Sequence, residues 1–270
     1  MTTALDPIKA KHRAMWALGD YDRVSTEVIP ELGEDLVTAA GITAGERVLD
    51  VAAGSGNASL PAARAGAHVT ATDLTPELLQ IGTDRAAAAG LDLTWQEADA
   101  EHLGLPDDAF DVTMSCVGVM FAPFHRPVAD ELLRVTRPGG RIALTNWTPD
   151  GFVGQLFATL KPFAAAPPAG ATPGPKWGDE AHVRALFGAG VTDLRAKRRE
   201  LPVGRFTSGE QFRRFFAAYY GPTIAAYRNV ADDPARTVEL DAAIDALADA
   251  HGAGTGVMRW GYLQVVATVA

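Results

Sequence analysis

The sequence is poor in cysteine, and its histidines are scattered. Cys116 is the only cysteine among 270 residues, which excludes an internal disulfide and is typical of a protein of the reducing cytoplasm. The six histidines lie far apart, and none belongs to a set of histidine, cysteine and carboxylate residues at ligand spacing. We therefore expect a cytoplasmic protein without a metal site.

Long apolar runs and an excess of positive charge are also missing. No run of about eighteen apolar residues occurs, and no basic segment is followed by a short apolar one, so neither a membrane span nor a signal peptide is expected. The net charge of −9 argues against a nucleic-acid partner, because nucleic acids are bound through a basic face. The basic cluster of Arg195, Lys197, Arg198 and Arg199 is interpreted as the solvated face of a strand.

Between residues 47 and 146, strand and helix patterns alternate regularly. Strands are predicted at 47–51, 68–72, 91–96, 110–116 and 141–146. Helices are predicted between them at 57–65, 75–90 and 127–136. Thr75 is suited to cap the second of these helices, and Gly90 is suited to end it. This alternation implies an α/β fold with an open, doubly wound parallel sheet, in which ligands bind at the carboxyl ends of the strands.

After residue 147 the alternation is interrupted by two insertions. Residues 148–178 contain a short helix and the irregular stretch PFAAAPPAGATPGP, whereas residues 202–255 contain an aromatic helix and a further helix near 234–250. Residues 179–201 and 256–270 return to the core and supply its last strands. We expect the second insertion to form a helical lid over the carboxyl edge of the sheet.

Two local signals bound the aromatic helix of the second insertion. Thr207 and Glu210 predict a capping box at its start. The sequence FRRFFAAYYGP predicts a break at Gly221-Pro222. The helix is therefore expected to be short and to carry a dense aromatic face.

The stretch VLDVAAGSGNASL, residues 48–60, has the features of a ligand-binding turn. Gly54 and Gly56 follow a buried strand and allow the backbone to pass close under a ligand. A dinucleotide fingerprint would need a third glycine where Ser59 stands, and no phosphate-binding lysine follows the turn. Asp50 beside the turn would repel a pyrophosphate, but it would attract a cation such as an amino-acid ammonium group.

Further carboxylates follow the next two predicted strands. Asp73 ends one of them, where a carboxylate can accept hydrogen bonds from both hydroxyls of a ribose. The tripeptide Asp99-Ala100-Glu101 follows the other and suits the exocyclic amine and ring nitrogen of a purine. Adenine, ribose, no phosphate and a charged amino-acid tail together describe S-adenosylmethionine.

Four segments in this order resemble a class I S-adenosylmethionine-dependent methyltransferase. They are VLDVAAGSGNASL, TATDLTPELL, EADAEHLGLPDDAFDVTMS and LLRVTRPGGRIALTNW, and the resemblance covers about residues 14–147 and the closing strands. The whole chain, including GVMFAPFHRP, NWTPDGFVGQLF and FFAAYYGP, is similar to actinobacterial small-molecule methyltransferases related to the enzymes of ubiquinone and menaquinone biosynthesis. The resemblance implies a Rossmann-like methyltransferase fold with a seven-stranded, mostly parallel sheet and helical lid insertions.

The resemblance implies contacts along the methionine and ribose parts of the cofactor. Gly54 and Gly56 would line the methionine portion, with Asp50 near its ammonium group. Asp73 would hold the ribose, and Leu74 would flank the adenine.

It also implies contacts at the two ends of the cofactor. Asp99 and Ala100 would hold the adenine edge, with Glu101 next to them. Cys116 and Val117, at the end of the fourth strand, would lie beside the methionine. No chemistry is assigned to the Cys116 thiol, which is typical of a small core residue.

A helical N-terminal segment, residues 1–40, is expected to cover the cofactor. Trp16, Gly19 and Tyr21 resemble the stretch that closes over it in this group. A packing role is the alternative for Trp16 and Tyr21. Residues 41–147 would form the cofactor-binding core beneath this segment.

Methyl transfer is an in-line attack on a carbon that the sulfonium activates, so the protein supplies orientation, exclusion of water and sometimes a base. His125, after the fourth strand, is the candidate base, and a helix-capping or surface role is the alternative. Related enzymes often carry an acidic residue where this chain has Phe124.

Tyr219 and Tyr220 are candidate hydrogen-bond partners of the substrate. Only one of them is expected to face the pocket, and core packing is the alternative.

Aromatic side chains are numerous enough to build an apolar acceptor pocket or, alternatively, part of the core. The candidates are Phe121, Phe124, Trp147, Trp177, Phe216 and Trp260.

The leading hypothesis is therefore a methyltransferase that acts on carbon, oxygen or nitrogen of a small-molecule substrate. The substrate would belong to secondary metabolism or quinone-like chemistry, and the protein would be a monomer or homodimer. The alternatives are a nucleotide-binding oxidoreductase and a non-catalytic cofactor-binding protein.

Overall fold

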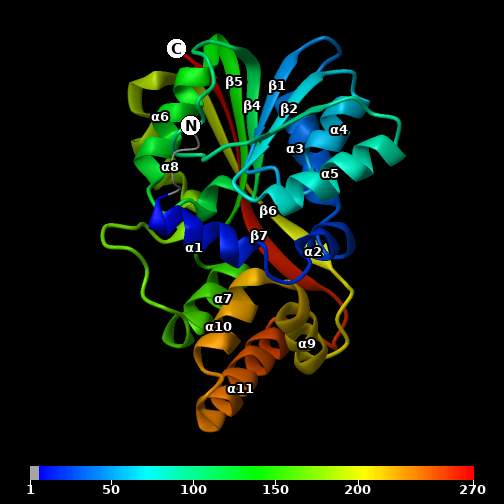
Figure 1. Ribbon diagram of the computed structural model, residues 1–270, viewed down its shortest axis with the longest axis vertical. Helices are drawn as coiled ribbons and strands as arrows, with labels where there is room; N and C mark the ends of the chain where they lie inside the picture. The colour runs from blue at the N-terminus through cyan, green and yellow to red at the C-terminus, as the bar shows by residue number, and fades with distance from the viewer. Residues whose placement is uncertain (1–5) are drawn as a thin grey trace.

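A seven-stranded sheet organises the computed structural model, which describes residues 6–270 (Figure 1). The strands lie in the order β3-β2-β1-β4-β5-β7-β6. They are β1 (Arg47–Val51), β2 (His68–Asp73), β3 (Thr94–Glu97), β4 (Phe110–Cys116), β5 (Thr136–Trp147), β6 (Val191–Val203) and β7 (Met258–Val269). Strands β1 to β5 pair in parallel, whereas β7 is antiparallel to both β5 and β6. The predicted doubly wound, mostly parallel sheet is confirmed.

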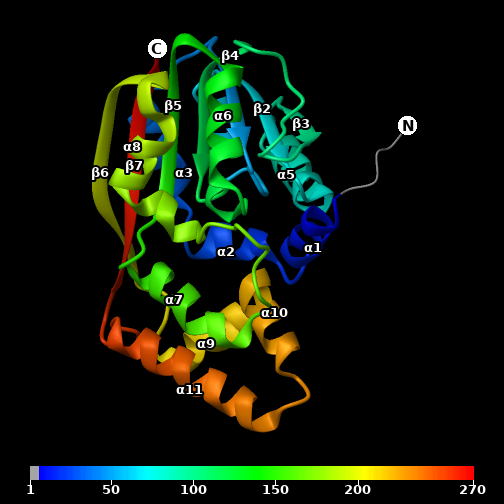
Figure 2. The ribbon, with the colours of Figure 1, turned by 90° about the vertical axis from the view of Figure 1, so that its left-hand side faces the viewer.

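Helices cover both faces of this sheet and one of its ends. One face carries α3 (Glu31–Ala40), α4 (Ser59–Arg64) and α5 (Pro76–Ala88), and the other carries α6 (His125–Val135) and α8 (Glu180–Phe187) (Figure 1). At the end where the parallel strands finish lie α1 (Pro7–Trp16), α2 (Tyr21–Glu27), α7 (Phe152–Leu160), α9 (Gly209–Tyr219), α10 (Gly221–Asn229) and α11 (Pro234–Ala250) (Figure 2). Short 3-10 turns at 119–121, 161–163, 174–178 and 188–190 complete the fold.

Successive residues of a strand point to opposite faces of the sheet, and this alternation separates two layers of core. Val48 packs with α3 and α4 on one face, whereas Leu49 packs on the other. The core layer that contains Leu49 extends beyond the sheet. It continues through Trp260 to Phe212 of α9 and Leu240 of α11, in the group of helices at the end of the sheet, hereafter the helical end. The helices of residues 202–255 are thus built on the same core as the sheet.

The structure corrects several predicted boundaries. Strand β3 begins at Thr94 rather than at residue 91, and β5 begins at Thr136 rather than at residue 141, so it includes Pro138 and the glycines after it. The predicted break at Gly221-Pro222 is present, since α9 ends at Tyr219, but the pair also opens a further helix, α10, that was not predicted. Proline is tolerated there because it lacks only an N–H that the first helical turn leaves unpaired.

The capping signal at the start of α9 is also displaced by one residue. Ser208, not Thr207, is the N-cap, and its hydroxyl accepts a hydrogen bond from the Gln211 backbone N–H at 3.1 Å. The Gln211 side chain in turn accepts from the Thr207 N–H at 2.6 Å. Glu210 pairs with Arg214 on the exposed side of the helix instead.

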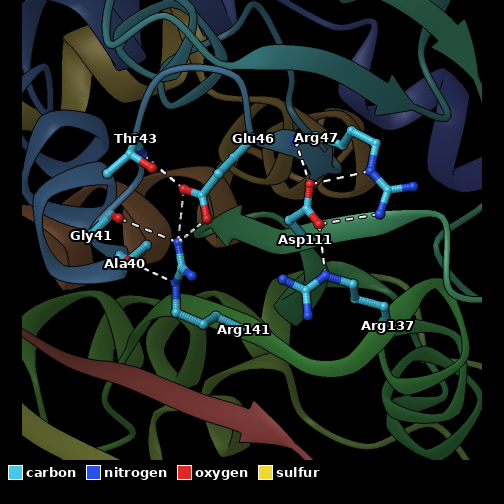
Figure 3. A network of polar contacts seen from close by, with 8 residues as sticks. All are labelled: Ala40, Gly41, Thr43, Glu46, Arg47, Asp111, Arg137 and Arg141. Atoms are coloured by element: carbon cyan, nitrogen blue, oxygen red, sulfur yellow. Dashed lines mark hydrogen bonds and ion pairs between the residues drawn. The ribbon is translucent and has the colours of Figure 1, made fainter.

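The opposite end of the sheet is tied together by ion pairs (Figure 3). The Asp111 carboxylate accepts hydrogen bonds from the Arg47 backbone N–H at 2.8 Å and from the Arg137 guanidinium at 2.7 Å. These donors hold the pKa of Asp111 well below its usual range. Arg141 reaches Glu46 at 2.8 Å in the same way. Ion pairs at this end therefore join β1, β4 and β5.

Two structural features are missing from the described part of the chain. No helix within residues 6–270 is long and apolar enough to cross a membrane. Over the same residues, no three histidine, cysteine or acidic side chains are grouped closely enough to hold a metal ion.

Candidate active site

A pocket opens at the carboxyl ends of β1, β2 and β4, next to the point where the strand order reverses between β1 and β4. Open α/β sheets bind their ligands at this position because loops from neighbouring strands diverge there. Of the residues expected to contact a cofactor, the pocket is lined by Trp16, Tyr21, Gly54, Asp73, Leu74, Asp99, Ala100, Cys116 and Val117. The structure thus brings together residues that are up to about a hundred positions apart in the chain.

The glycine turn forms the floor of the pocket. Gly54 and Gly56 have φ angles of +57° and +89°, which favour glycine. A Cβ atom on Gly56 would also lie 2.8 Å from the ring of Trp95, so a side chain there is excluded by space as well as by backbone conformation. Gly56 itself does not line the pocket; it shapes the turn that does.

Asp73 fastens this turn to the end of β2. One carboxylate oxygen accepts from the Gly54 backbone N–H and the other from the Thr75 backbone N–H, both at 2.8 Å. The carboxylate is nearly buried, and burial raises its pKa against the effect of these two donors. The Thr75 hydroxyl, at the expected N-cap of α5, is buried without a partner and belongs to the pocket lining.

Asp50 lies behind the turn rather than in the pocket lining. One of its oxygens accepts from the Ser59 hydroxyl at 2.6 Å, and the other is buried without a partner. Burial raises the pKa of Asp50 to about 7. Ser59, which replaces the third glycine of a dinucleotide fingerprint, therefore serves as the donor to this carboxylate.

Asp99 and Ala100 form the wall of the pocket that follows β3. The Asp99 carboxylate is engaged by the Glu101 backbone N–H at 3.0 Å and by the ammonium group of Lys9 at 2.9 Å. Glu101 does not line the pocket; its carboxylate accepts from the Phe124 N–H at 2.9 Å. It thereby joins the loop after β3 to the loop after β4.

The end of β4 supplies the opposite wall. Cys116 and Val117 line it together with Gly118 and Phe121. Burial raises the pKa of the Cys116 thiol, which favours the neutral thiol over the thiolate. Val117 adopts a φ angle of +47°, which turns the chain sharply at the edge of the pocket.

The N-terminal helices close the pocket from the side. Trp16 and Tyr21 line it, and their ring centroids lie 5.5 Å apart. Gly19 does not reach the pocket; with a φ angle of +69° it makes the turn between α1 and α2, where a Cβ atom would lie 2.7 Å from the Tyr219 carbonyl oxygen. Its role is to let the N-terminal helices pack against the helical end.

Three polar residues of this segment were not found from the sequence. Lys9 and His12 belong to the same face of α1 as Trp16, with spacings of three and four residues, and His12 lines the pocket. Asp22 of α2 accepts from the Ser55 hydroxyl at 2.7 Å, beside the glycine turn. The helical periodicity of Lys9, His12 and Trp16 was the available signal, but without the fold nothing indicated which face of the helix meets the pocket.

His125, the candidate base, is not brought to the pocket. It opens α6, is only 2% exposed, and its Nδ1 lies 2.9 Å from Nε2 of His182 on α8. Its ring packs 5.3 Å from that of Trp177. Burial and His182 lower the pKa of His125 to about 4. The structure therefore gives His125 a place in the packing between α6, α8 and the 174–178 turn, and we set aside its role as the base.

Replacing His125 by glutamine is expected to change stability and leave turnover near the wild-type value. The low native pKa means that the unfolded chain takes up a proton at His125 near pH 6.5, whereas the folded protein takes it up only near pH 4. In this window stability falls as the pH is lowered, because the unfolded state binds more protons. Urea unfolding between pH 4 and 7 should show a shallower fall for the variant. A large loss of turnover at unchanged stability would restore the base hypothesis.

The two adjacent tyrosines point in different directions. The Tyr219 hydroxyl pairs with Arg23, whose guanidinium lies 4.2 Å from the centre of the Tyr219 ring. Tyr220 is buried, and its ring centroid lies 5.8 Å from that of Trp16 and 6.4 Å from that of Tyr21. Tyr220 is thus the tyrosine turned toward the pocket rings, whereas Tyr219 joins α2 to α9.

Most of the aromatic candidates belong to the core. Trp147, Trp177, Phe216 and Trp260 are each at most 4% exposed. Phe121 lines the pocket, and Phe124 is half-buried beside the loop that contains Gly170. The rings around the pocket are those of Trp16, Tyr21 and Phe121, with Tyr220 and Phe157 behind them.

The pocket residues fit a nucleoside with an amino-acid tail. The lining at the turn consists of small residues, Ala52, Ala53, Gly54 and Ser55, and the carboxylates of Asp73 and Asp99 stand at the end of β2 and after β3. Two buried oxygens, Asp50 Oδ1 behind the turn and Thr75 Oγ1 at the start of α5, have no hydrogen-bond partner within the described residues. Among residues 6–270, no lysine or arginine lines the pocket, where it could bind a pyrophosphate.

Comparison with known proteins agrees with this geometry. A family model described as a methyltransferase domain matches residues 49–144. An uncharacterized protein of Mycobacterium tuberculosis is 52% identical over 252 residues, which are 93% of this chain and 92% of that protein. A demethylmenaquinone methyltransferase of Clavibacter sepedonicus is 38% identical over 134 residues, 47% of this chain and 54% of that protein. The crystal structure of the YcgJ protein from Bacillus subtilis superposes with a TM-score of 0.59 at 17% identity, covering 88% of this chain and 97% of that one.

Proposed function

Since the chain belongs to the class I S-adenosylmethionine-dependent methyltransferases, we propose that it transfers a methyl group from S-adenosylmethionine to a small, flat and largely apolar metabolite. The observation that carries the proposal is the position of Asp73. Its carboxylate holds the glycine turn through the Gly54 N–H and lines the pocket beside the Asp99 wall. Family membership and this arrangement together support the cofactor and the reaction class.

In this proposal each wall of the pocket holds one part of the cofactor. Asp73 accepts from the ribose hydroxyls, while Leu74, Asp99 and Ala100 enclose the adenine. The methionine portion lies over Gly54 between the turn and Cys116. Asp50, with one unpartnered oxygen, lies behind the turn, and an ammonium group bound over the turn would favour the ionised form of its carboxyl.

The acceptor is proposed to bind among the aromatic rings. Trp16 lies 4.6 Å from Phe121, and Phe121 lies 5.7 Å from Phe157, measured between ring centroids. These rings and Tyr220 come from α1, the turn after β4, α7 and the start of α10, and of them Trp16 and Phe121 line the pocket. Burial raises the pKa of both Tyr21 and Tyr220, which keeps their phenols neutral. Such a surface favours a flat, uncharged molecule.

The Clavibacter relative methylates a menaquinone precursor, as its name states, and a quinone-like acceptor is consistent with these rings. S-Adenosylmethionine supplies an already activated methyl group, so the chain has to orient the acceptor and exclude water. With His125 turned away, an acceptor whose carbon, oxygen or nitrogen is itself electron-rich suits the pocket best. Secondary metabolism or quinone chemistry remains the proposed setting.

The helices at the sheet end are proposed to enclose the bound acceptor. The Asp20 N–H donates to the Tyr219 carbonyl oxygen at 3.1 Å, and Arg23 of α2 pairs with the Tyr219 hydroxyl. Gly221 lies so close to Met15 that a Cβ atom would be 2.4 Å from the Met15 carbonyl oxygen. These contacts support a continuous cover made of residues 6–40 and 202–255; the first five residues of the predicted N-terminal segment lie outside the described part of the chain.

Calorimetry with S-adenosylmethionine, S-adenosylhomocysteine and NAD tests the cofactor assignment. We expect the two adenosyl compounds to bind and NAD to show no measurable affinity. Mass spectrometry after incubation with S-adenosylmethionine and a panel of quinols, phenols and aromatic amines then tests transfer. Binding of NAD alone would favour an oxidoreductase, and cofactor binding without transfer to any acceptor would favour a non-catalytic protein.

A further inference from the structure

Lys9 occupies an unusual position for a lysine of a short N-terminal helix. Only 8% of the residue is exposed, and its ammonium group lies 2.9 Å from an Asp99 carboxylate oxygen and 2.6 Å from a Glu101 carboxylate oxygen. Lysine is rarely buried unless its charge is paired, so this position depends on the two carboxylates. The contact joins residues about ninety positions apart in the chain.

The same helix has a second ion pair to the same part of the sheet, and it differs in exposure. Arg13 contacts Glu97, the last residue of β3, at 2.8 Å, with side chains that are 34% and 45% exposed. The side chains of Lys9 and Glu101 are each 10% exposed. Exposed pairs contribute little, whereas breaking a buried pair leaves an uncompensated charge. The two pairs can therefore be compared within one helix.

Asp99 gives the buried pair a connection to the pocket. One oxygen of its carboxylate accepts hydrogen bonds from both the Lys9 ammonium group and the Glu101 backbone N–H. The orientation of the Asp99 carboxylate is therefore fixed from one side. Asp99 lines the pocket at the wall after β3, and His12, one turn along α1 from Lys9, lines it as well. Without the ammonium group, the Asp99 and Glu101 carboxylates would face each other unscreened.

We propose that Lys9 is a positioning residue for adenine recognition: it holds the Asp99 carboxylate toward the exocyclic amine of the adenine and fastens α1 across the bound nucleoside. This inference rests on the proposed use of S-adenosylmethionine. It assigns to the N-terminal helix a part in choosing the base, in addition to covering it. Glu101 extends the effect, because its other oxygen accepts from the Phe124 N–H in the loop that follows β4.

The test compares two thioethers that differ only in the base. S-Adenosylhomocysteine presents an amine to Asp99, whereas S-inosylhomocysteine presents a carbonyl oxygen that a fixed carboxylate would repel. Affinities and dissociation rates are measured by calorimetry and stopped-flow for the wild type, for Lys9→Met and for the matched control Arg13→Met. Thermal unfolding of each variant verifies that it folds. If Lys9→Met does not fold, Lys9→Gln serves in its place, since it keeps a polar head without the charge.

For Lys9→Met we expect the affinity for S-adenosylhomocysteine to fall about 10- to 100-fold, mainly through faster dissociation. The preference for the adenine compound over the inosine compound should fall about tenfold or more. Arg13→Met should change both quantities less than about threefold. A purely structural role of Lys9 would weaken both ligands equally and leave the preference unchanged, which would overturn the proposal. Wild-type protein that binds neither thioether would instead refute the proposed function.

Discussion

Replacement of Asp73 by alanine is expected to weaken binding of S-adenosylmethionine by about 100- to 1,000-fold, because two charge-assisted hydrogen bonds to the ribose would be lost. The change would also release the Gly54 and Thr75 N–H groups, which the carboxylate now accepts at 2.8 Å. Isothermal titration calorimetry measures the loss directly. Asp84→Ala, at an exposed position of α5, is the matched control and should bind like the wild type.

The ribose contact and the support of the turn can be separated with a modified ligand. A 2′-deoxy analogue of S-adenosylhomocysteine lacks one hydroxyl but would lie on the same turn. Wild-type protein should bind it more weakly than the parent compound, whereas Asp73→Ala should hardly distinguish the two. Equal discrimination by both proteins would mean that Asp73 supports only the turn.

The second large effect is expected for Trp260→Ala, which should lower the free energy of unfolding by about 3–5 kcal/mol. Trp260 is 2% exposed and stacks on Phe152 at 5.0 Å between ring centroids. It also lies 5.7 Å from Trp147 and 6.2 Å from Phe212, so it contacts rings of both the sheet and the helical end. Truncation would leave a cavity between these rings that they cannot fill without moving.

Chemical denaturation followed by circular dichroism and by tryptophan fluorescence provides the measurement. Val238→Ala, whose side chain is 67% exposed on α11, is the control and should change stability by less than about 0.5 kcal/mol. Because the sheet and the helices share one core, both probes should report a single transition. Two separate transitions would show that the helical end unfolds as an independent unit.

Elements and residues whose positions depend on nearby residues, or on the order of strands and helices, were predictable from the sequence. Strand β1 was predicted with its observed bounds, and Asp73 and Asp99 were found because the carboxyl ends of parallel strands meet at one edge. The glycine turn was found because Gly54 and Gly56 follow a buried strand directly. In each case the relevant neighbours lie within a few residues or follow from the sheet topology.

The remaining features depend on partners that are distant in the chain. The direction of His125 is determined by His182, fifty-seven residues away on another helix, and the burial of Lys9 by Asp99, ninety residues away. The pair Gly221-Pro222 is suited both to end one helix and to begin another, and the structure shows both, with α10 packed closely against the Met15 backbone. Periodicity shows that a helix has faces, but it does not show which partner each face meets.

The position of β7 between β5 and β6 also constrains how the protein folds. Strand β6 precedes β7 in the chain, yet within the sheet it pairs only with β7. During synthesis, β6 and the open edge of β5 therefore remain unpaired until β7 is made, more than fifty residues after β6. Long-range pairing of this kind slows folding and leaves strand edges exposed to association with other chains. The charged side chains of β6, among them Arg195, Lys197 and Arg199, are well placed to prevent aggregation through β6 while it is unpaired.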